Sequence, residues 1–222
     1  MGIIHMEDIY KEYRSGDGLV NALNGVSLDI NKGEFVAITG TSGSGKSTLL
    51  NILGGLERET RGEVYYNKQS VAKYSKLSEY RRENIGFVFQ SFNLLPILTV
   101  EENICLPLLI RGEEISQTRV DEVIKRLNLD NKRKTLSKQL SGGEQQRTAI
   151  GRAIISKPQI LLADEPTGNL DSVNTKRIME LLREMNEEGQ TIVMVTHDTS
   201  IAASCSRNIV LEDGKIIEDI YR

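Results

Sequence analysis

Cysteine is scarce in this chain: only Cys105 and Cys205 occur among its 222 residues. They lie far apart and form no close-spaced pair of the kind that binds a metal or makes a redox motif. This favours free cytosolic thiols over a disulfide, with a buried, inert thiol as the default for each. The length suffices for one large α/β domain or two small subdomains without stabilisation by disulfides or metals.

Long apolar runs are also missing, and none approaches the length of a membrane span. Residues 1–8 carry acids where a secretory signal peptide carries bases. Position 6 is Met, where an N-myristoylation signal prefers Ser or Thr. We therefore expect a cytoplasmic polypeptide that reaches a membrane only through a partner.

Neither sign of charge dominates, because the formal net charge is only -3. This gives no global electrostatic argument for binding nucleic acid or an anionic membrane, so no nucleic-acid partner is expected. Internal repeats and low-complexity tracts are absent as well.

Apolar patterning predicts an α/β core interrupted by helices. Segments that alternate or are continuously apolar predict strands at residues 26–30, 35–39, 62–66, 85–89, 160–163 and 191–196, and a hairpin at 209–217. A helical stripe is formed by Ile178, Leu181, Leu182 and Met185, with Gly189 at its end.

The middle of the chain has a different pattern, which predicts helices. Residues 93–100 are apolar but broken by Pro96, which favours a loop leading into a helix. Thr118 with Asp121 resembles a capping box before a further helical stripe at residues 120–127. We therefore expect an α/β core with its β-subdomain at 1–90 and 157–222, and a helical insert at 91–156.

Residues 40–47 fill the pattern G-x-x-x-x-G-K-[ST] at every fixed position, between a predicted strand and a predicted helix. Backbone N–H groups of such a loop, and the helix N-terminus behind it, attract phosphate oxygens. Lys46 is placed to reach the β- and γ-phosphates, and the Ser47 hydroxyl to bind Mg²⁺. A Gly/Ser-rich flexible turn is the alternative, and the strand–loop–helix setting disfavours it. The predicted nucleotide-binding residues here are Gly40, Thr41, Ser42, Gly43, Ser44, Gly45, Lys46, Ser47 and Thr48.

Residues 140–147, Leu-Ser-Gly-Gly-Glu-Gln-Gln-Arg, form a second motif. Locally they predict a helix start, with Ser141 as N-cap and Glu144 completing a capping box. Taken alone, that structural role is favoured. The adjacent Gly142 and Gly143 nevertheless weaken a first helical turn while exposing backbone N–H groups to an anion.

Asp164 and Glu165 end the predicted strand at 160–163. In a parallel α/β sheet this end faces the ligand crevice. Asp164 is placed to hold Mg²⁺ or its water, and Glu165 to polarise an attacking water. Solvated acids at a strand end are the alternative, which the phosphate loop in the same chain makes weaker.

These three motifs, in this order, closely resemble the nucleotide-binding ATPase subunit of ABC transporters, over essentially the whole chain. The Leu-Ser-Gly-Gly element is the discriminating one, because a phosphate loop alone marks a wider class of NTPases. The resemblance implies a single ABC ATPase domain over 1–222, binding ATP and Mg²⁺. Its α/β fold would be a P-loop NTPase (RecA-like) core with an N-terminal antiparallel β-subdomain and a helical signature-motif subdomain.

Further site residues follow from the resemblance. Tyr13 resembles the aromatic residue that stacks on adenine, although a lone Tyr is usually packing. Gln90 resembles the glutamine that contacts Mg²⁺ and links the core to the helical subdomain, although a strand-end Gln is normally just solvated. His197 resembles the histidine at the γ-phosphate and joins Lys46 and Glu165 as a catalytic residue, where a surface histidine is the alternative.

The resemblance also implies a homodimer with ATP at the interface, each nucleotide lying between one phosphate loop and the partner's signature motif. The residues expected at that contact are Ser141, Gly142, Gly143, Glu144 and Asp171. The loop of residues 169–171 departs mildly from the family's common Ser-Ala-Leu-Asp, because Asn169 stands in it.

Two segments narrow the subfamily. They resemble the ATPases of the lipoprotein-release, macrolide-exporter and antimicrobial-peptide-resistance group, and they lie at residues 164–172 and 93–96. This implies an ATPase, peripheral at the inner face of the membrane, that drives a permease moving or extracting lipoprotein, peptide or drug-like cargo. Within the group, residues 147–152 lean toward the peptide-resistance branch. A partner that signals to cell-wall enzymes without transport is the alternative.

Two other classes fit less well. A DNA-repair ATPase would need a long coiled-coil insert, and no heptad run lies between the phosphate loop and residue 140. A ribosome-associated relative would carry two such domains in tandem.

The apolar span from Ser91 to Leu109 suggests where a partner docks. Its apolar residues are Phe92, Leu94, Leu95, Ile97, Leu98, Val100, Ile104, Leu106, Leu108 and Leu109. A subdomain core could absorb some of them, and an apolar groove left open usually marks a binding site. We expect a short permease helix to dock there, next to Gln90.

Overall fold

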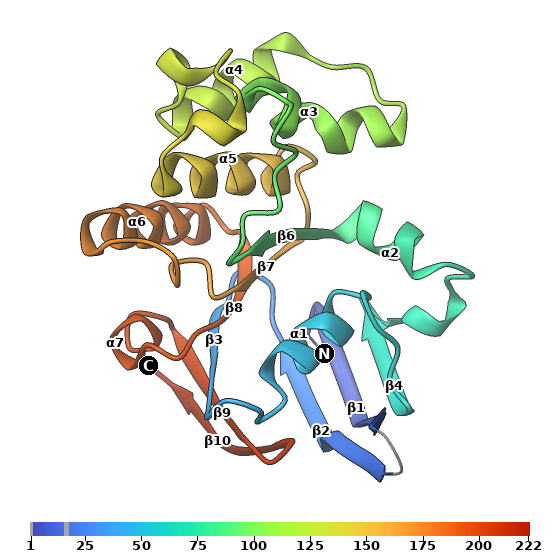
Figure 1. The fold of residues 1–222 in the computed structure, drawn as a ribbon. Coiled ribbons are helices and arrows are strands. Elements are labelled where there is room, and N and C mark those ends of the chain that lie inside the picture. Colours follow the sequence, from blue (N-terminus) through green and yellow to red (C-terminus); the bar gives the residue numbers. More distant parts are fainter. Residues whose placement is uncertain (1, 16–17) are drawn as a thin grey trace.

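The strands of this computed structural model, within the described residues 2–15 and 18–222, form two sheets (Figure 1). Residues 1, 16 and 17, part of the expected core, lie outside those ranges. In sheet order, the four-stranded antiparallel sheet contains β2 (Gly18–Ile30), β1 (Ile4–Ser15), β4 (Arg61–Tyr66) and β5 (Gln69–Ser70). The six-stranded sheet contains β10 (Lys215–Tyr221), β9 (Arg207–Glu212), β3 (Phe35–Thr39), β8 (Thr191–Val195), β7 (Ile160–Asp164) and β6 (Ile85–Phe89).

From β9 to β6 the second sheet is parallel, and only the edge strand β10 runs antiparallel. Strands β3 and β8 are buried along their whole length, which is why both read as unbroken apolar runs in the sequence. The β9–β10 hairpin turns through Asp213 and Gly214, both with positive φ as a two-residue turn requires.

The helices are α1 (Lys46–Leu53), α2 (Leu77–Asn84), α3 (Val100–Arg111), α4 (Gln117–Arg126), α5 (Gly142–Ile154), α6 (Ser172–Glu187) and α7 (Thr199–Ala202). Helices α3, α4 and α5 lie together at the top of Figure 1, with α5 below the other two. No helix in the described part of the chain has both the length and the hydropathy to cross a bilayer.

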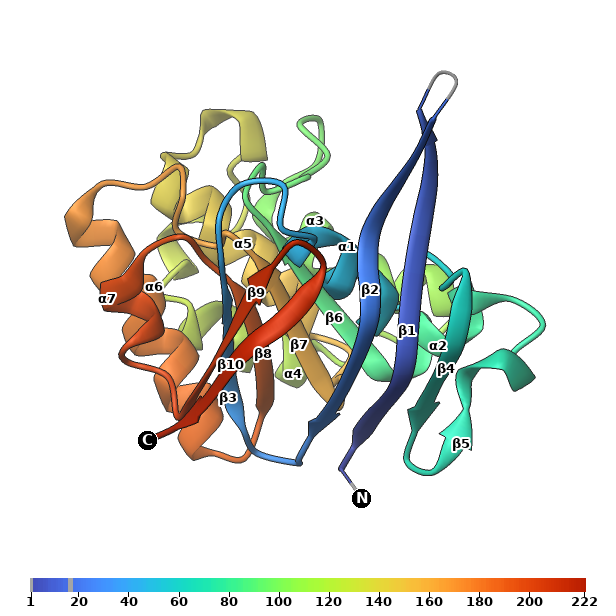
Figure 2. The same cartoon turned by 90° about the horizontal axis from the view of Figure 1, so that it is seen from below.

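Two hydrophobic clusters cover the two faces of the six-stranded sheet. Successive residues of β3 alternate between them, as the period of two in a strand requires: Val36 and Ile38 join one cluster, Phe35 and Ala37 the other. The first cluster packs α1 between the two sheets, as Figure 2 shows from below. The second continues from α6 through α5 into α3 and α4, so this helical region shares a core with the sheet.

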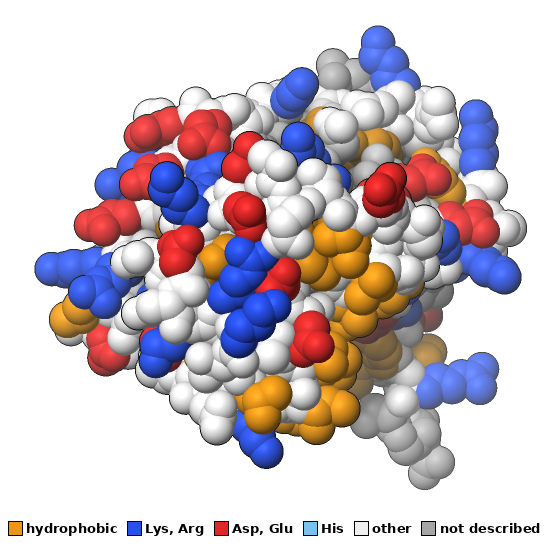
Figure 3. All heavy atoms as spheres, turned by 90° about the horizontal axis from the view of Figure 1, so that it is seen from above, with side chains coloured by type: hydrophobic (Ala, Val, Ile, Leu, Met, Phe, Trp, Pro, Cys, Tyr) orange, Lys and Arg blue, Asp and Glu red, His pale blue; other side chains and the backbone are white. Residues whose placement is uncertain are grey.

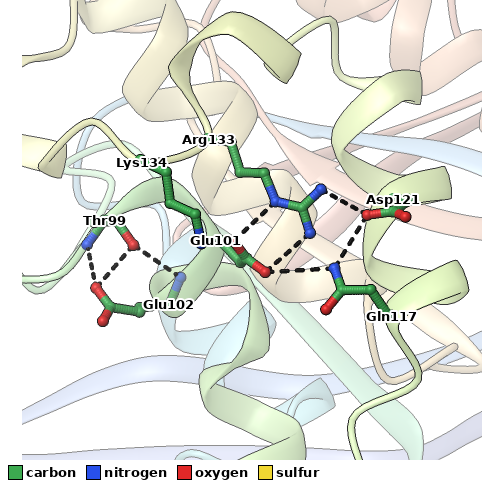
Figure 4. Close-up of polar contacts among 7 residues, drawn as sticks. All are labelled: Thr99, Glu101, Glu102, Gln117, Asp121, Arg133 and Lys134. Atoms are coloured by element: carbon green, nitrogen blue, oxygen red, sulfur yellow. Dashed lines mark hydrogen bonds and ion pairs between the residues drawn. The ribbon is translucent and has the colours of Figure 1, made fainter.

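A polar network joins the N-terminal ends of α3 and α4 (Figure 4). The Arg133 guanidinium donates to both carboxylate oxygens of Glu101, at 2.8 and 2.9 Å, and to Asp121 at 2.6 Å. Lys134 donates to Glu101 at 2.8 Å. These bonds, chiefly those from Arg133, lower the pKa of Glu101 to about 2.

The same network shows that the predicted capping box at Thr118 is wrong. Helix α4 begins at Gln117, and its N-cap is Ser116, which accepts from the Arg119 N–H. Asp121 accepts from Arg133 and Gln117 instead of completing a box. A long-range ion pair thus engages the acid that the local pattern had assigned to a cap.

The parallel strands end at one edge of the sheet, and the loops that follow them carry the predicted chemistry. Residues 40–45 follow β3 and Gln90 follows β6, while β7 ends at Asp164 and His197 lies just beyond β8. Strand pairing sets Asp164 opposite Phe89 and Val195. This edge is the usual ligand crevice of a parallel α/β sheet.

Candidate nucleotide-binding site

A pocket of about 490 Å³ opens at this edge of the sheet. Its lining is Ala22, Gly40, Ser42, Gly43, Gly45, Lys46, Ser47, Thr48, Gln90, Asp164, Glu165, Val195 and His197. All but Ala22 and Val195 are residues that the sequence analysis assigned to nucleotide binding, metal binding or catalysis. The volume is in the range of small-molecule sites.

The phosphate loop wraps the N-terminus of α1. Gly45, the N-cap, has φ of 101°, and a Cβ there would lie 2.2 Å from the Ala22 carbonyl oxygen, so only glycine fits. The Lys46 ammonium donates to the carbonyl oxygens of Gly40 at 2.9 Å and Thr41 at 2.6 Å. Its positive charge and the helix N-terminus therefore face the same pocket, which suits an anion.

Thr41 and Ser44 support the loop and do not line the pocket. The Thr41 carbonyl accepts both from Lys46 and from the Ser44 N–H, the latter at 3.2 Å. Ser44 is buried, and its hydroxyl oxygen lies 3.4 Å from the Lys46 ammonium.

Side chains with oxygen atoms suited to a hard cation line the same pocket as the loop. The Ser47 hydroxyl and the Asp164 carboxylate are both among the lining residues. Burial raises the pKa of Asp164 and neighbouring Glu165 raises it further, while Ser47 and Lys46 act in the opposite direction. A hydroxyl, a carboxylate and the amide of Gln90 in one pocket are the donor types that Mg²⁺ takes alongside phosphate oxygens and water, so the residues fit that ion.

Glu165 is held in an uncommon conformation, with φ of 47°. Its backbone N–H donates to the Val195 carbonyl at 3.0 Å, and its carboxylate lies 2.7 Å from Nδ1 of His197. The hydrogen bond and charge of Glu165 raise the pKa of His197. An acid–imidazole pair at the mouth of a phosphate pocket can orient a water and move its proton.

Tyr13 lies outside the lining of the pocket but next to it. Its hydroxyl donates to Glu57 and lies 3.5 Å from the hydroxyl of Thr48, which does line the pocket. The ammonium of Lys11 lies 5.0 Å from the ring centroid. The Tyr13 hydroxyl is thus held beside α1, which contains Thr48. Its partner Glu57 was not predicted from the sequence.

The signature residues do not reach the pocket. None of Ser141, Gly142, Gly143 and Glu144 is among its lining residues in the described chain. Ser141 and Glu144 form the predicted capping box at the start of α5: the Ser141 N–H donates to Glu144 at 2.8 Å, and the Glu144 N–H to the Ser141 hydroxyl at 3.4 Å. The predicted helix start is therefore confirmed, and the nucleotide-binding role of the motif stays a prediction.

Asp171 also lies outside the pocket, as the N-cap of α6. Its carboxylate accepts from the N–H groups of Val173 and Asn174, each at 2.9 Å, and from the Asn174 amide at 2.6 Å. Asn174 in turn lies against Gly143, where a Cβ would come within 2.2 Å of the Asn174 side-chain oxygen. The start of α5, hereafter the signature helix because it carries the signature motif, thus packs on the first turn of α6. Sequence patterns do not reveal this contact.

Gln90 has one side-chain partner that sequence analysis missed. Its Nε2 donates to Oδ1 of Asn169 at 3.3 Å, while the Asn169 Nδ2 donates to the Gln90 carbonyl at 3.0 Å. The sequence distinguishes Asn169 only by its departure from the family's common Ser-Ala-Leu-Asp.

Comparison with known proteins gives the family. The sequence profile described as ABC transporter matches residues 23–168. An uncharacterized ABC transporter ATP-binding protein of Methanocaldococcus jannaschii, MJ0796, is 46% identical over 96% of this chain and 95% of its own length. The macrolide export ATP-binding/permease protein MacB of Mannheimia succiniciproducens is 44% identical over 100% of this chain, which spans 35% of that relative's length.

A solved structure agrees in fold. The dimeric post-hydrolysis state of the ATP-binding cassette MJ0796 bound to ADP and Pi has a TM-score of 0.90 and 43% identity, covering 98% of both chains. The chain belongs to the ABC transporter family, as an ATP-binding cassette. Its α/β fold is the expected P-loop NTPase fold.

Proposed function

We propose that the pocket at the strand ends binds ATP with Mg²⁺ and hydrolyses it. Residues 40–48 hold the phosphates, and Ser47, Gln90 and Asp164 are the protein's oxygen ligands for the ion, which neutralises phosphate charge when bound. Glu165 accepts the proton of the attacking water and is oriented by His197, 2.7 Å away. Tyr13 stacks on the base beside the pocket.

We propose further that each site is completed by a second copy of the chain. The single observation behind this is that the phosphate loop lies in a pocket that none of the described signature residues lines, while Ser141–Gly143 open a helix N-terminus elsewhere on the chain. Support also comes from the similar cassette MJ0796, whose structure with ADP and Pi is dimeric. In a head-to-tail dimer, Ser141, Gly142, Gly143 and Glu144 of each chain would meet the other's nucleotide, with Asp171 at the contact.

Two substitutions separate the shared site from a single-chain site. Lys46→Ala should abolish ATP binding, because it deletes the charge facing the phosphates. Ser141→Arg should leave the ATP affinity of the single chain intact and abolish dimerisation and turnover. ATP affinity measured by fluorescence titration and dimer content by size exclusion test this. If Ser141→Arg lowers single-chain ATP affinity as much as Lys46→Ala does, the shared-site proposal is wrong.

The partner that uses this energy is, in our proposal, a membrane permease that moves or extracts lipoprotein, peptide or drug-like cargo. The chain would sit at the cytoplasmic face of the membrane, with residues 91–156 acting as a helical subdomain on the core of 1–90 and 157–222. Support comes from MacB, which is named as a macrolide export protein with both ATP-binding and permease functions. The formal net charge of -3 gives no electrostatic argument for a nucleic-acid partner.

The docking segment predicted from the sequence, Ser91 to Leu109, is only partly exposed to solvent. Val100, Ile104 and Leu108 are buried in the core, whereas Leu95, Ile97 and Leu109 are exposed. Hydrophobic side chains also gather on the face that carries α3 (Figure 3).

A groove of about 430 Å³ lies beside α3, between β6, α2 and α5. Its apolar lining includes Phe87, Phe89, Leu106, Pro107 and Ile110. The charged residues that line it are Arg81, Arg82, Arg111 and Arg152, with no acid among its described lining residues. We propose that it receives a short permease helix with an apolar face and an acidic residue.

Ile110→Glu tests this groove, because Ile110 lines it and is 69% exposed. The change should abolish co-purification of the permease and leave basal ATPase activity in place. Ile97→Glu is the matched control, since Ile97 is 76% exposed and does not line the groove. Unchanged permease capture by the Ile110 variant would move the docking site elsewhere.

A further inference from the structure

We infer that Asn169 is a positioning residue that fixes which atom of the Gln90 amide faces the pocket. The two side chains come from loops 79 residues apart in the sequence, after β6 and after β7. They share two hydrogen bonds: Asn169 Nδ2 to the Gln90 backbone carbonyl at 3.0 Å, and Gln90 Nε2 to Asn169 Oδ1 at 3.3 Å.

The direction of these bonds follows from chemistry at one end. A backbone carbonyl can only accept, so the Asn169 atom that meets the Gln90 carbonyl must be the NH₂ group. That leaves Oδ1 of Asn169 toward the Gln90 side chain, and Oδ1 can only accept. The Gln90 atom that meets it must therefore be Nε2. Oε1 of Gln90 therefore takes no part in this pair. Because Gln90 lines the pocket with Ser47 and Asp164, Oε1 is the amide atom left to face it.

The backbone of the same loop restricts the Gln90 side chain from a second side. A Cβ at Gly168 would lie 2.7 Å from Nε2 of Gln90 and 3.2 Å from its Cδ. The amide therefore packs directly on the Gly168 backbone, which leaves it little room to swing away. Asn169 and Gly168 together hold the amide by its nitrogen side.

The consequence for function rests on the proposed Mg²⁺ site. Oxygen is the atom that Mg²⁺ accepts from an amide, and an NH₂ group in its place would repel the ion. Partners of a metal ligand that orient it raise metal affinity without touching the metal. The loop that carries Asn169 also contacts the start of the signature helix, since a Cβ at Gly142 would lie 3.5 Å from the Leu170 side chain. Gln90 is thus oriented by the loop that also contacts the signature helix.

The test is the affinity of the ATP-loaded chain for Mn²⁺, measured by EPR titration with Glu165→Gln as the background to prevent turnover. In that background, Gln90→Ala should weaken Mn²⁺ binding by roughly tenfold, and Asn169→Leu or Asn169→Ala by a similar factor, the low end for such orienting partners. Combining Asn169→Leu with Gln90→Ala should weaken it no further than Gln90→Ala alone, because Asn169 acts only through the amide.

Asn31→Leu is the matched control: the Asn31 amide also donates one side-chain hydrogen bond, to Glu34 at 2.6 Å, but at the other end of β3. It should leave Mn²⁺ affinity unchanged. ATP affinity in EDTA should be the same for all variants, which shows that they are folded. The inference is overturned if Asn169→Leu leaves Mn²⁺ affinity unchanged. It is also overturned if Asn169→Leu weakens Mn²⁺ binding by the same factor whether or not Gln90→Ala is present. If Gln90→Ala itself has no effect, the proposed metal site is wrong, and the inference fails with it.

Discussion

Glu165 is the residue proposed to accept the proton of the attacking water, and its environment suits that role. It is mostly shielded from solvent, with 19% of the side chain exposed, and its carboxylate pairs with His197. We predict that Glu165→Gln retains ATP binding but lowers turnover by about 10²–10⁴-fold, because an amide cannot accept the proton of the attacking water. Stalled chains should accumulate as an ATP-bound dimer on size exclusion.

Glu184→Gln is the control for that substitution, since Glu184 is an exposed acid on α6. It should turn over ATP at the wild-type rate. Wild-type turnover by the Glu165 variant would remove Glu165 from the catalytic role.

For Tyr13, the structure allows the ring and the hydroxyl to be tested separately. Tyr13→Ala should weaken ATP binding by about 1–3 kcal/mol, the scale of base–aromatic stacking, and GTP binding by a similar amount. Tyr13→Phe keeps the ring and loses only the hydroxyl contacts with Glu57 and Thr48, so ATP affinity should stay near wild type. Isothermal titration distinguishes the two, and equal losses in both variants would argue against stacking.

At the scale of single residues, site residues at fixed motif positions could be predicted from the sequence. Partners that lie far apart in the sequence could not. Lys46, Ser47, Asp164 and Glu165 stand at motif positions, and each lines the pocket. Asn169 could not be assigned from the sequence, because its role depends on a contact with Gln90 across 79 residues.

At the scale of elements, the polar network between α3 and α4 makes a testable contribution to stability. Glu101 has an ordinary pKa of 4.5 and a folded-state pKa of about 2. A lowered folded pKa means that its contribution is complete above about pH 4.5 and is lost as pH falls toward 2. We predict that Glu101→Gln costs about 1–3 kcal/mol at pH 7, because it removes charge-assisted bonds to Arg133 and Lys134.

The measurement is urea unfolding followed by circular dichroism at pH 7 and at pH 3. The free energy of unfolding of the wild type should fall more between these two values than that of Glu101→Gln. Parallel losses in the two proteins would show that Glu101 is not the titrating group.

Elements with strong local signals were predicted, and those shaped by distant contacts were missed. The buried strands β3, β6 and β8 and the 209–217 hairpin follow their sequence patterns. The long strand β1 escaped notice because irregular pairing after Met6 interrupts its alternation. Helix α2 escaped because only Tyr80 and Asn84 are buried on it, which leaves no apolar stripe.

At the scale of the whole molecule, the parallel sheet explains why distant segments converge. Loops after β3, β6, β7 and β8 meet at one edge because parallel strands share their carboxyl ends there. The signature helix α5 lies on the α6 side of the sheet and shares its hydrophobic cluster. In the proposed dimer, each chain would therefore supply its phosphate loop to one shared site and its signature motif to the other.

Mixing two inactive variants tests that central claim most directly. Lys46→Ala keeps its signature motif and Ser141→Arg keeps its phosphate loop, so a mixed dimer contains one intact composite site. We predict that each variant alone shows no ATPase activity and that the mixture recovers a substantial fraction of the wild-type rate, rising with total protein concentration. A mixture as inactive as its components, although both variants are folded and present together in dimers, would contradict the shared-site account.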